Sequence, residues 1–315
     1  MPKIHPILVS HSINNLADYC MRKFELFSLY GNRPKRESGY AADVGTALHD
    51  GVQAFLIADA DGHDDYTARF RGYMAFLAAF PYVLEAEQKQ SNRSFNNAVL
   101  LLEMLFNSPI WQDYELVRVD GHGWAVEVPF IIRHTTVPGV IHSDAHNKDF
   151  MFVTQGKIDM IMRHRVTGKI ITLDLKTTVL RDDMWEGEYK FSGQQIGYSH
   201  VVHAMLGIQP EEFEVAYIVA SFGTEIPSVE LLQMEKPEEL IADYWRTQLD
   251  RLYRVKGYIE QDWFPRRNGG CVSWAHTCNA IDVCHRRDHE FVMDWFRAIE
   301  SEPIETYDYW VELEL

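Results

Sequence analysis

Hydrophobic and polar residues follow a helical period through the first third of the chain. Apolar side chains recur every three or four positions from residue 12 to about 30 and over 44–59. The same spacing continues over roughly 64–107, with a break near Pro81. Such spacing places apolar side chains on one face of an α-helix, and Gly31 is positioned to end the first one. This part of the chain is therefore predicted to be helical.

The pattern changes near residue 115 to short runs rich in β-branched and aromatic residues. Two runs flank Asp120-Gly-His-Gly123, and two longer runs flank Val166-Thr-Gly-Lys169. Runs of this kind around glycine-containing turns are typical of β-hairpins. Beyond them the pattern predicts, in order, a helix at 192–206, strands at 213–221 and 228–234, a long helix after Pro237, a loop from Phe264 to Cys284 and a last helix from about His285 to Ser301, followed by an acidic tail.

This order of elements predicts an α/β fold with a mixed central sheet flanked by helices. We expect a single domain over 1–315, because no linker is long or polar enough to require a second one. Its core would span about 115–235, between a helical N-terminal segment, 1–110, and a C-terminal segment, 236–315.

The charge of the chain narrows the possible partners. The formal net charge is −16 over 315 residues, which argues against a generally basic nucleic-acid coat but leaves room for a local basic groove. Candidate basic clusters are Arg33-Pro-Lys-Arg36, Arg163-His-Arg165, Arg266-Arg267 and Arg286-Arg287. No hydrophobic run reaches transmembrane length and the N-terminus lacks signal-peptide features, so we expect a cytoplasmic protein that does not enter a membrane.

One predicted strand carries two opposite charges on the same face. In Gly168–Thr178, "GKIITLDLKTT", Asp174 and Lys176 are two positions apart. The turn before this strand would fold it against the preceding one and bring Asp159 near Asp174. Two converging carboxylates repel unless a cation lies between them, and Mg²⁺ suits one or two carboxylates plus phosphate and water. A lone ion pair on a strand surface is the simpler alternative.

Three motifs in order give this strand a family context. Gly156-x-x-Asp159, Asp174-x-Lys176 and Gln194-x-x-x-Tyr198 resemble the signature of the PD-(D/E)XK nuclease superfamily, most closely its RecB-like branch. The resemblance implies a restriction-endonuclease-like core in which Asp159 and Asp174 bind Mg²⁺ or Mn²⁺ and Lys176 assists the attacking water. Gln194 and Tyr198 would contact DNA or position the lysine.

The same resemblance extends to residues around the core. It implies that His49 on an N-terminal helix and the Leu175 carbonyl complete the metal ligands. Glu127 matches an acidic strand residue upstream of the core, although a solvated glutamate explains it equally well. Gln195 replaces Gln194 if the register is shifted by one residue.

Four cysteines form a second constellation, one upstream of the motifs and three downstream. They are Cys20, Cys271, Cys278 and Cys284. Four thiolates are the ligand set of a [4Fe–4S] cluster, whereas the short C-x2-C spacing common in zinc sites is absent. Four unrelated thiols, or a zinc site that includes His276 or His285, are the alternatives. The arrangement resembles the iron–sulfur subgroup of RecB-like nucleases, which includes AddB-type subunits and CRISPR-associated adaptation nucleases; the x6 spacing between Cys271 and Cys278 departs from it.

The resemblance implies a Mg²⁺- or Mn²⁺-dependent deoxyribonuclease, with exonuclease action on single-stranded DNA or DNA ends. The alternative is a DNA-end-binding adaptor subunit of a recombination or CRISPR-type complex, and a protein partner is possible in either case. The pair His142 and His146 in "HSDAH" has helical spacing for zinc, but it lies between predicted strands and is interpreted as a surface loop. The chain contains no phosphate-binding G-x-x-x-x-G-K-[ST] loop, so no ATPase motor is encoded.

Overall fold

The computed structural model divides the chain into two compact units. It describes residues 4–9, 20–34, 39–82, 92–136, 138–179, 187, 189, 193–209, 213–223, 227–234, 238–266, 271–273, 276–299, 301–303 and 311–314. The first unit comprises Met1–Glu37, Pro129–Gly156 and Ala242–Leu315; the second comprises Ser38–Val128 and Lys157–Ile241. Each unit is assembled from segments far apart in the sequence, and each is described by itself below.

The second unit is built on a mixed sheet. Its strands are β9 Ile170–Thr178, β10 Phe213–Ser221, β11 Ser228–Met234, β3 Tyr114–Leu116 and the end of β8 Lys148–His164. β10 is parallel to β9 and antiparallel to β11, and both β9 and β3 pair antiparallel with β8. The α/β class, the mixed sheet and the hairpin around Val166-Thr-Gly-Lys169 are therefore confirmed.

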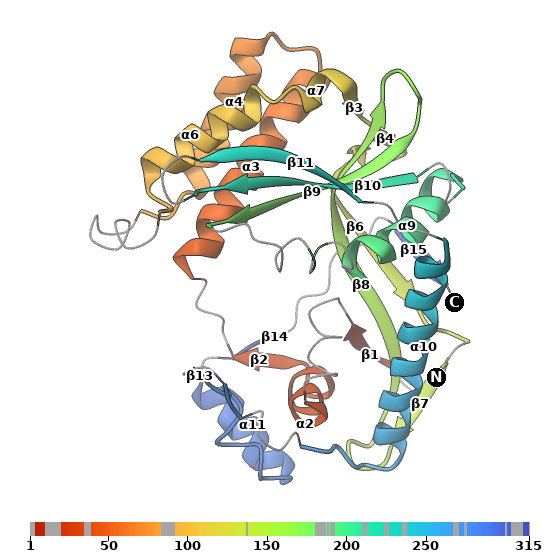
Figure 1. The fold of residues 1–315 in the computed structure, drawn as a ribbon. Coiled ribbons are helices and arrows are strands. Elements are labelled where there is room, and N and C mark those ends of the chain that lie inside the picture. The colour runs from red at the N-terminus through yellow and green to blue at the C-terminus, as the bar shows by residue number, and fades with distance from the viewer. Residues whose placement is uncertain are drawn as a thin grey trace. The chain divides into compact units, whose positions relative to one another are not determined.

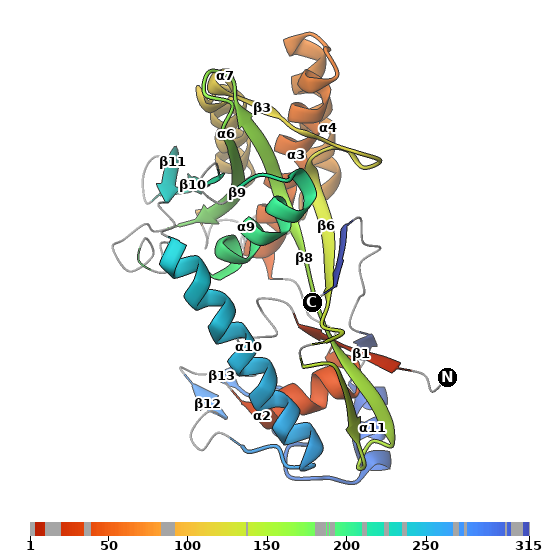
Figure 2. The same cartoon turned by 90° about the vertical axis from the view of Figure 1, so that its right-hand side faces the viewer.

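Helices cover both faces of this sheet (Figures 1 and 2). On one face, α3 Tyr40–Ala60 and α6 Phe95–Phe106 pack against Leu173 and Leu175 of β9 in a single hydrophobic core. On the opposite face, the Thr172 hydroxyl donates a 2.8 Å hydrogen bond to Gln195 of α9 Gly193–Leu206. Because successive residues of a strand point to opposite faces, Asp174 and Lys176 share the face of Thr172. Polar residues of β9 thus share this face with the buried Val215, Tyr217 and Val219 of β10.

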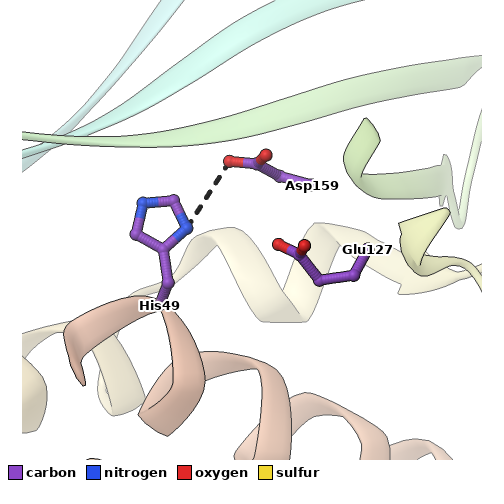
Figure 3. A group of neighbouring side chains, drawn as sticks. All are labelled: His49, Glu127 and Asp159. Atoms are coloured by element: carbon purple, nitrogen blue, oxygen red, sulfur yellow. Dashed lines mark ion pairs between the residues drawn. The ribbon is translucent and has the colours of Figure 1, made fainter. Parts of the chain in front are cut away.

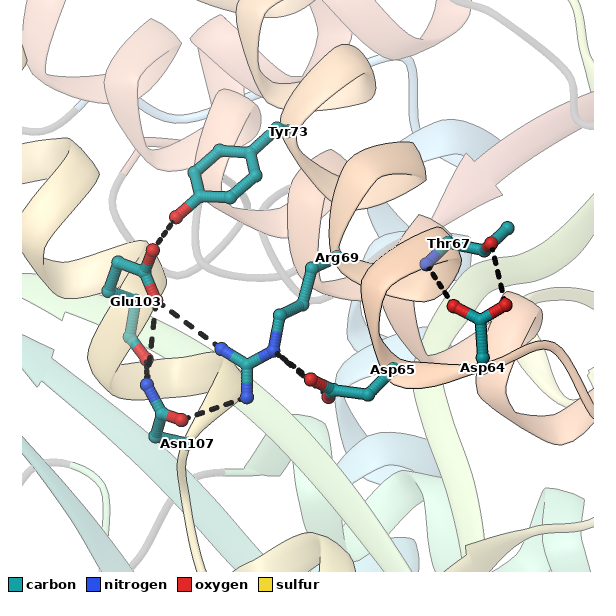
Figure 4. Close-up of polar contacts among 7 residues, drawn as sticks. All are labelled: Asp64, Asp65, Thr67, Arg69, Tyr73, Glu103 and Asn107. Carbon is teal, nitrogen blue, oxygen red and sulfur yellow. Dashed lines mark hydrogen bonds and ion pairs between the residues drawn. The ribbon is translucent and has the colours of Figure 1, made fainter.

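The second unit contains further elements besides the sheet and the helices already named. They are α4 Asp65–Ala79, α7 Ile110–Asp113 and the small hairpin of β4 Arg118–Val119 and β5 Gly123–Trp124. A polar network joins α4 to α6 (Figure 4): Arg69 binds Asp65, Glu103 and Asn107, and Tyr73 donates to Glu103. Burial together with this bond to Glu103 raises the pKa of Tyr73 to about 12, so the phenol stays a donor at any physiological pH.

Helices α3 and α4 approach each other at two glycines. A Cβ atom added at Gly72 would lie 2.5 Å from Phe106 Cζ and 2.8 Å from the Gly51 carbonyl oxygen. A Cβ at Gly51 would lie 3.2 Å from the Gly72 carbonyl oxygen. Only glycine at both positions permits this spacing, because the backbone of one helix occupies the place of the other's side chain.

We therefore expect Gly72→Ala to lower the free energy of unfolding by about 1–3 kcal/mol, the usual cost of overpacking a core. Gly257→Ala is the matched control: it lies inside α10 Glu238–Glu260, where the added Cβ meets no described atom within 4 Å. There the substitution should stabilise the protein by about 0.5–1 kcal/mol through helix propensity. Chemical denaturation of both variants measures the difference, and equal stabilities would contradict the close approach.

The first unit contains the terminal segments and the other parts of two shared strands. β1 Ile4–Val9 runs parallel to the first part of β8, β7 Val140–Ser143 pairs antiparallel with it, and β15 Val311–Glu314 runs parallel to β6 Val126–Arg133. The smaller strands are β2 Asn32–Pro34 with β14 Ser301–Pro303, and β12 Val272–Ser273 with β13 His276–Thr277. Its core includes Phe24, Phe150 and Phe152 packed against Leu252 and Ile259 of α10.

Several predictions need correction in this unit. Most of the predicted N-terminal helix lies outside the described residues; its described part is α2 Met21–Phe24 continued by a π-helical turn, η1 Glu25–Leu29, and it ends as predicted at Gly31, where φ is +73°. The last helix, α11 His289–Ala298, begins later than predicted, because Asp288 caps it by accepting a hydrogen bond from the Phe291 amide. The predicted acidic tail contributes β14 and β15 instead.

The interpretation of "HSDAH" as a surface loop is wrong in one respect for each histidine: His142 is in a strand, and His146, although in a turn, is buried. His142 lies in β7 and is exposed, with Nδ1 2.8 Å from Asp149 Oδ1. The His146 side chain is only 4% exposed and packs edge-on against Tyr30 and Phe150. Burial lowers the pKa of His146 to about 4, so it is a neutral core residue. Within the described parts of both units, no helix is long and apolar enough to cross a membrane.

Candidate active site

The two predicted carboxylates lie where the β8–β9 ladder ends. The last recorded pair is Met160 with Leu173, so Asp159 and Asp174 are the next residues on the two strands. Asp174 is 1% exposed, and its charge raises the pKa of Asp159. The convergence of the two carboxylates predicted from the hairpin is therefore present in the structure.

The carboxylates are buried without enough compensation. Burial, followed by the charge of Asp174, raises the pKa of Asp159 well above its ordinary value, although the Lys176 charge opposes this shift. Within the described residues, Asp159 Oδ2 and Asp174 Oδ1 have no hydrogen-bond donor. Buried carboxylate oxygens normally have donors or cations beside them. The donor set therefore fits a divalent cation, which prefers oxygen ligands of this kind.

His49 approaches the carboxylates from α3 (Figure 3). Its Nδ1 lies 3.6 Å from Asp159 Oδ2. Burial lowers the pKa of His49, an effect that exceeds the opposing influence of Asp174 and of a hydrogen bond to the Leu175 backbone. The imidazole is accordingly neutral, which is the form that binds metals. The structure thus places His49, Asp159 and the Leu175 backbone together, as the sequence suggested.

Glu127 joins this group from β6. One ligand atom from each of His49, Glu127 and Asp159 lies within 4.8 Å of the others (Figure 3). Glu127 has φ of +50°, a left-handed conformation that is uncommon outside glycine. Residues held in such conformations concentrate at functional sites.

Two further residues that the sequence analysis missed hold Glu127 in place. Gln53 Nε2 donates a 2.8 Å hydrogen bond to Glu127 Oε1, and Lys157 Nζ lies 3.4 Å from Oε2. Gln53 is four residues after His49, so both side chains project from the same face of α3. That spacing is the signal in the sequence that could have identified Gln53.

Lys176 is held as a cation beside Asp174. Its Nζ lies 2.5 Å from Asp174 Oδ2 and 6.0 Å from the centre of the Tyr189 ring. Burial lowers the pKa of Lys176, but the charge and hydrogen bond of Asp174 and the charge of Asp159 outweigh burial, and the pKa is raised overall. In the metal-free protein Lys176 therefore carries its proton and cannot act as a base.

The Gln194–Tyr198 pair connects α9 to the strand of Asp159. Gln194 Nε2 donates a 2.7 Å hydrogen bond to the Tyr198 hydroxyl, which donates a 2.6 Å bond to the Lys157 carbonyl. Tyr198 is buried, and burial followed by the Asp174 charge raises its pKa well above the ordinary value. The pair therefore fixes the backbone two residues before Asp159. Gln195 is fully buried and bonds Thr172, so Gln194 is the member in register with Tyr198.

The glycine of the first motif has a steric explanation. A Cβ at Gly156 would lie 2.7 Å from two atoms of the Phe130 ring. Real Cβ atoms do not approach a ring so closely, so this position of β8 accepts only glycine while Phe130 keeps its place.

The four cysteines lie in the first unit, and none forms a disulfide. Burial raises the pKa of Cys284, and charges on Cys20 and Cys271 would raise it further, opposed by Arg266 and Arg22. Such mutual influence requires the three thiols to lie near one another. Cys278 is tied to the same place, because its amide donates a 2.7 Å hydrogen bond to the Cys271 carbonyl. Among the described side chains no three cysteine sulfurs lie within 4.8 Å of one another, so the structure shows no formed metal site here and the predicted cluster stays a prediction.

A mixed sheet that presents two neighbouring carboxylates and a lysine beside a neutral histidine is the arrangement of a nuclease core. The sequence profile described as "PD-(D/E)XK nuclease superfamily" matches residues 8–285. The chain therefore belongs to the PD-(D/E)XK nuclease superfamily.

Solved structures and curated proteins add little beyond this. The crystal structure of a putative exonuclease from Eubacterium rectale is 12% identical, with 88% of this chain and 92% of that chain covered and a TM-score of 0.45. The crystal structure of SSO0001 is 13% identical, with 76% and 86% covered and a TM-score of 0.24. A comparison with curated proteins finds no match.

Proposed function

We propose that this protein is a divalent-metal-dependent deoxyribonuclease of the RecB-like branch that hydrolyses phosphodiester bonds. The observation that carries the proposal is the buried pair Asp159 and Asp174, with carboxylate oxygens that lack donors among the described residues, beside neutral His49 and charged Lys176. DNA is the substrate class that membership of the nuclease superfamily implies.

His49, Asp159, Asp174 and the Leu175 carbonyl would hold Mg²⁺ or Mn²⁺, and Glu127 is a further ligand supported by its position beside His49 and Asp159. A divalent ion in this place would lower the pKa of a bound water and stabilise charge on the phosphate oxygens. The strained backbone at Glu127 and its bonds to Gln53 and Lys157 keep that side chain oriented before substrate arrives.

Lys176 enters the reaction as an ammonium. Its raised pKa depends on the charges of Asp174 and Asp159, so neutralisation of those carboxylates would lower the pKa towards the value that burial alone favours. Lys176 would orient the attacking water through hydrogen bonds and offset charge on the phosphate in the transition state. Gln194 and Tyr198 act as positioning residues, because they hold the Lys157 carbonyl and so the strand that carries Asp159.

Exonuclease action on single-stranded DNA or DNA ends, in recombination, repair, phage or CRISPR-type processing, is the form of the activity we propose. The alternative is an adaptor subunit that binds DNA ends without cutting them. The Lys176–Asp174 ion pair favours the enzyme, since an adaptor would not need a charged pair buried at this cost. A partner protein is compatible with both.

We also propose that Cys20, Cys271, Cys278 and Cys284 hold a [4Fe–4S] cluster, with Zn²⁺ as the alternative. The proposal is supported by the proximity of three of the thiols and by the backbone link of the fourth. Burial, and to a smaller extent the charges of Cys20 and Cys271, raise the pKa of Cys284, and a cluster would compensate the thiolate charge. It would also join segments at the two ends of the chain.

The test is a cleavage assay on end-labelled single- and double-stranded DNA with Mg²⁺, Mn²⁺ or EDTA. We expect cleavage only with metal, and a loss of about 10²-fold or more in Lys176→Ala, in line with the removal of one positioned donor that stabilises charge in the transition state. Lys169→Ala is the matched control, because this exposed lysine pairs with Glu214 on the same sheet and lies outside the site. Metal-independent cleavage, or full activity of Lys176→Ala, would disprove the assignment; DNA binding without cleavage by the wild type would favour the adaptor.

A further inference from the structure

A second concave feature lies in the same unit as the candidate site. A cavity of about 430 Å³ opens between the end of α3, α7, β3, the β4–β5 hairpin and the end of β8. This volume falls within the roughly 300–1,000 Å³ of small-molecule sites. Its walls include three aromatic residues and three arginines, namely Trp111, Tyr114, Trp124, Arg118, Arg163 and Arg165. None of the six takes part in the proposed hydrolysis.

The aromatic walls are held by hydrogen bonds, and the N–H groups of both tryptophans are already used. Trp111 Nε1 donates a 2.6 Å hydrogen bond to the Leu105 carbonyl, and Trp124 Nε1 donates a 2.8 Å bond to Asp61 Oδ1. The Tyr114 hydroxyl accepts a bond from Gln233 Nε2. The half-buried Trp111 and Trp124 therefore offer a ligand ring surface rather than directional hydrogen bonds, while the buried Tyr114 forms the floor beside them. Such surfaces stack on flat π-systems without selecting among them.

Among the residues of the cavity wall, three arginines accompany two carboxylates, and a third carboxylate, Asp61, binds the Nε1 of Trp124. Arg165 Nη1 pairs with Glu115 Oε2 at 2.9 Å, which neutralises one carboxylate of the wall. Arg118 and Arg163 have no ion pair within the described residues, and Asp59 is the remaining wall carboxylate. Two arginines without an ion pair at one cavity are notable in a chain with a net charge of −16.

The position of Arg118 suits a phosphate. Its guanidinium stacks 4.2 Å from the centre of the Trp124 ring, its cross-strand neighbour in the β4–β5 hairpin. Stacking occupies the face of a guanidinium and leaves the N–H groups at its edge, which bind phosphate oxygens in a fork.

The cavity lies close enough to the candidate metal site for one DNA strand to contact both. On α3, Leu56 of the cavity wall follows His49 by seven residues, roughly 10 Å at the helical rise and on the same helix face. On β8, Arg163 follows Asp159 by four residues, roughly 13 Å, again on the same face. Two independent elements of the same unit thus give similar spacings.

We propose that this cavity holds one nucleotide of the DNA strand, a few nucleotides from the phosphate that is cut. The base stacks on the aromatic walls, and the phosphate binds Arg118 and Arg163. The proposal deepens the nuclease function and rests on it only for the origin of the nucleotide. Because the N–H groups of both tryptophans are used within the protein, recognition should be tolerant of base identity. The ligand chemistry is a nucleobase with its phosphate, which a DNA strand or a free nucleotide could supply.

The first test measures binding of a fluorescent single-stranded oligonucleotide in EDTA, where no metal-dependent cleavage occurs. We expect the double variant Arg118→Ala/Arg163→Ala to bind at least tenfold more weakly. The slope of log affinity against log salt should become shallower by about 1.4, since each phosphate contact on a single strand contributes about 0.7. Arg71→Ala, which removes an exposed arginine of α4 in the same unit, should leave affinity and slope unchanged. An unaltered slope in the double variant would overturn the phosphate contact.

The second test separates stacking from charge and the strand from a free nucleotide. Trp124→Leu should weaken oligonucleotide binding several-fold, whereas Trp124→Phe, which keeps a ring, should retain most of it; equal losses would overturn stacking. Thymidine monophosphate and inorganic phosphate then compete with the oligonucleotide. If the arginine variant lost only monophosphate binding and bound the oligonucleotide normally, the site would serve free nucleotides and the strand assignment would be wrong. These readouts need no catalysis, so a failure of the proposed nuclease activity would appear separately, as absent cleavage by the wild type.

Discussion

Asp174→Asn and Asp159→Asn are each expected to abolish metal-dependent cleavage while leaving the metal-free protein folded. We expect a loss of more than about 10³-fold, equivalent to more than about 4 kcal/mol of transition-state stabilisation. The reason is that each carboxylate would contribute both a ligand and the negative charge that attracts the ion. An asparagine side chain keeps the shape and loses the charge. The end-labelled DNA assay with Mg²⁺ or Mn²⁺ measures the loss.

The Asp159→Asn substitution should not destabilise the protein in EDTA, which separates a functional role from a structural one, whereas Asp174→Asn also removes the buried ion-pair partner of Lys176 and should lower stability. Burial and the Asp174 charge raise the pKa of Asp159 above its ordinary 3.8. A carboxyl with a higher pKa in the folded state binds more protons there than in the unfolded state. The free energy of unfolding therefore falls as the pH rises from 3.8 through the folded-state pKa. Asp159→Asn removes this decline, so the metal-free variant should equal or exceed the wild type in stability at pH 8.

With metal present, the wild type should become more stable than the two aspartate variants. At a metal concentration one hundred times the dissociation constant, binding stabilises the wild type by about 2.7 kcal/mol, and the variants should gain little. Asp113→Asn, an exposed aspartate in the same unit, is the matched control and should retain activity and metal response. If Asp159→Asn cleaved DNA normally, or if the wild type were no more stable with metal than in EDTA, the metal site would be refuted.

The part of this site that could be predicted from the sequence is the part set by local pattern. Alternation along β9 places Asp174 and Lys176 on one face, and the turn at Val166-Thr-Gly-Lys169 sets the register that brings Asp159 to Asp174. Helical spacing places Gln194 and Tyr198 together. Each of these placements follows from the side-chain periodicity of one helix or strand, together with the direction of one turn.

What could not be predicted depends on contacts between distant segments. Glu127 becomes a member of the site only because β6 adopts a left-handed residue beside α3. His146 is buried because Tyr30 and Phe150 close over it, although its neighbours in sequence are polar. The acidic tail forms strands because β2 and β6 offer free edges. Propensity says little about such positions, since tertiary packing decides them.

The second large prediction is that the four cysteines bind an iron–sulfur cluster. Protein purified without oxygen should be brown and contain about four iron atoms per chain, as a [4Fe–4S] cluster requires. Serine in place of any one of the four, with Cys20 and Cys284 the first to test, should remove most of the iron. Asn279→Ser is the matched control, because it alters an exposed side chain beside Cys278 and removes no thiol.

Loss of the cluster should cost stability as well as colour. Cys20 directly precedes α2, while Cys271 and Cys284 lie more than 200 residues later in the chain, so the cluster would close a very long loop. The chain-entropy relation assigns a cross-link over such a loop about 5 kcal/mol, relative to an unlinked chain. Thermal unfolding under anaerobic conditions measures the difference between wild type and variants. Colourless protein with one zinc per chain would replace the cluster by the zinc alternative. If the protein instead contained no metal, and its serine variants unfolded at the wild-type temperature, the four cysteines would be independent thiols. Only a metal that all four share makes the loss of one thiol equivalent to the loss of all.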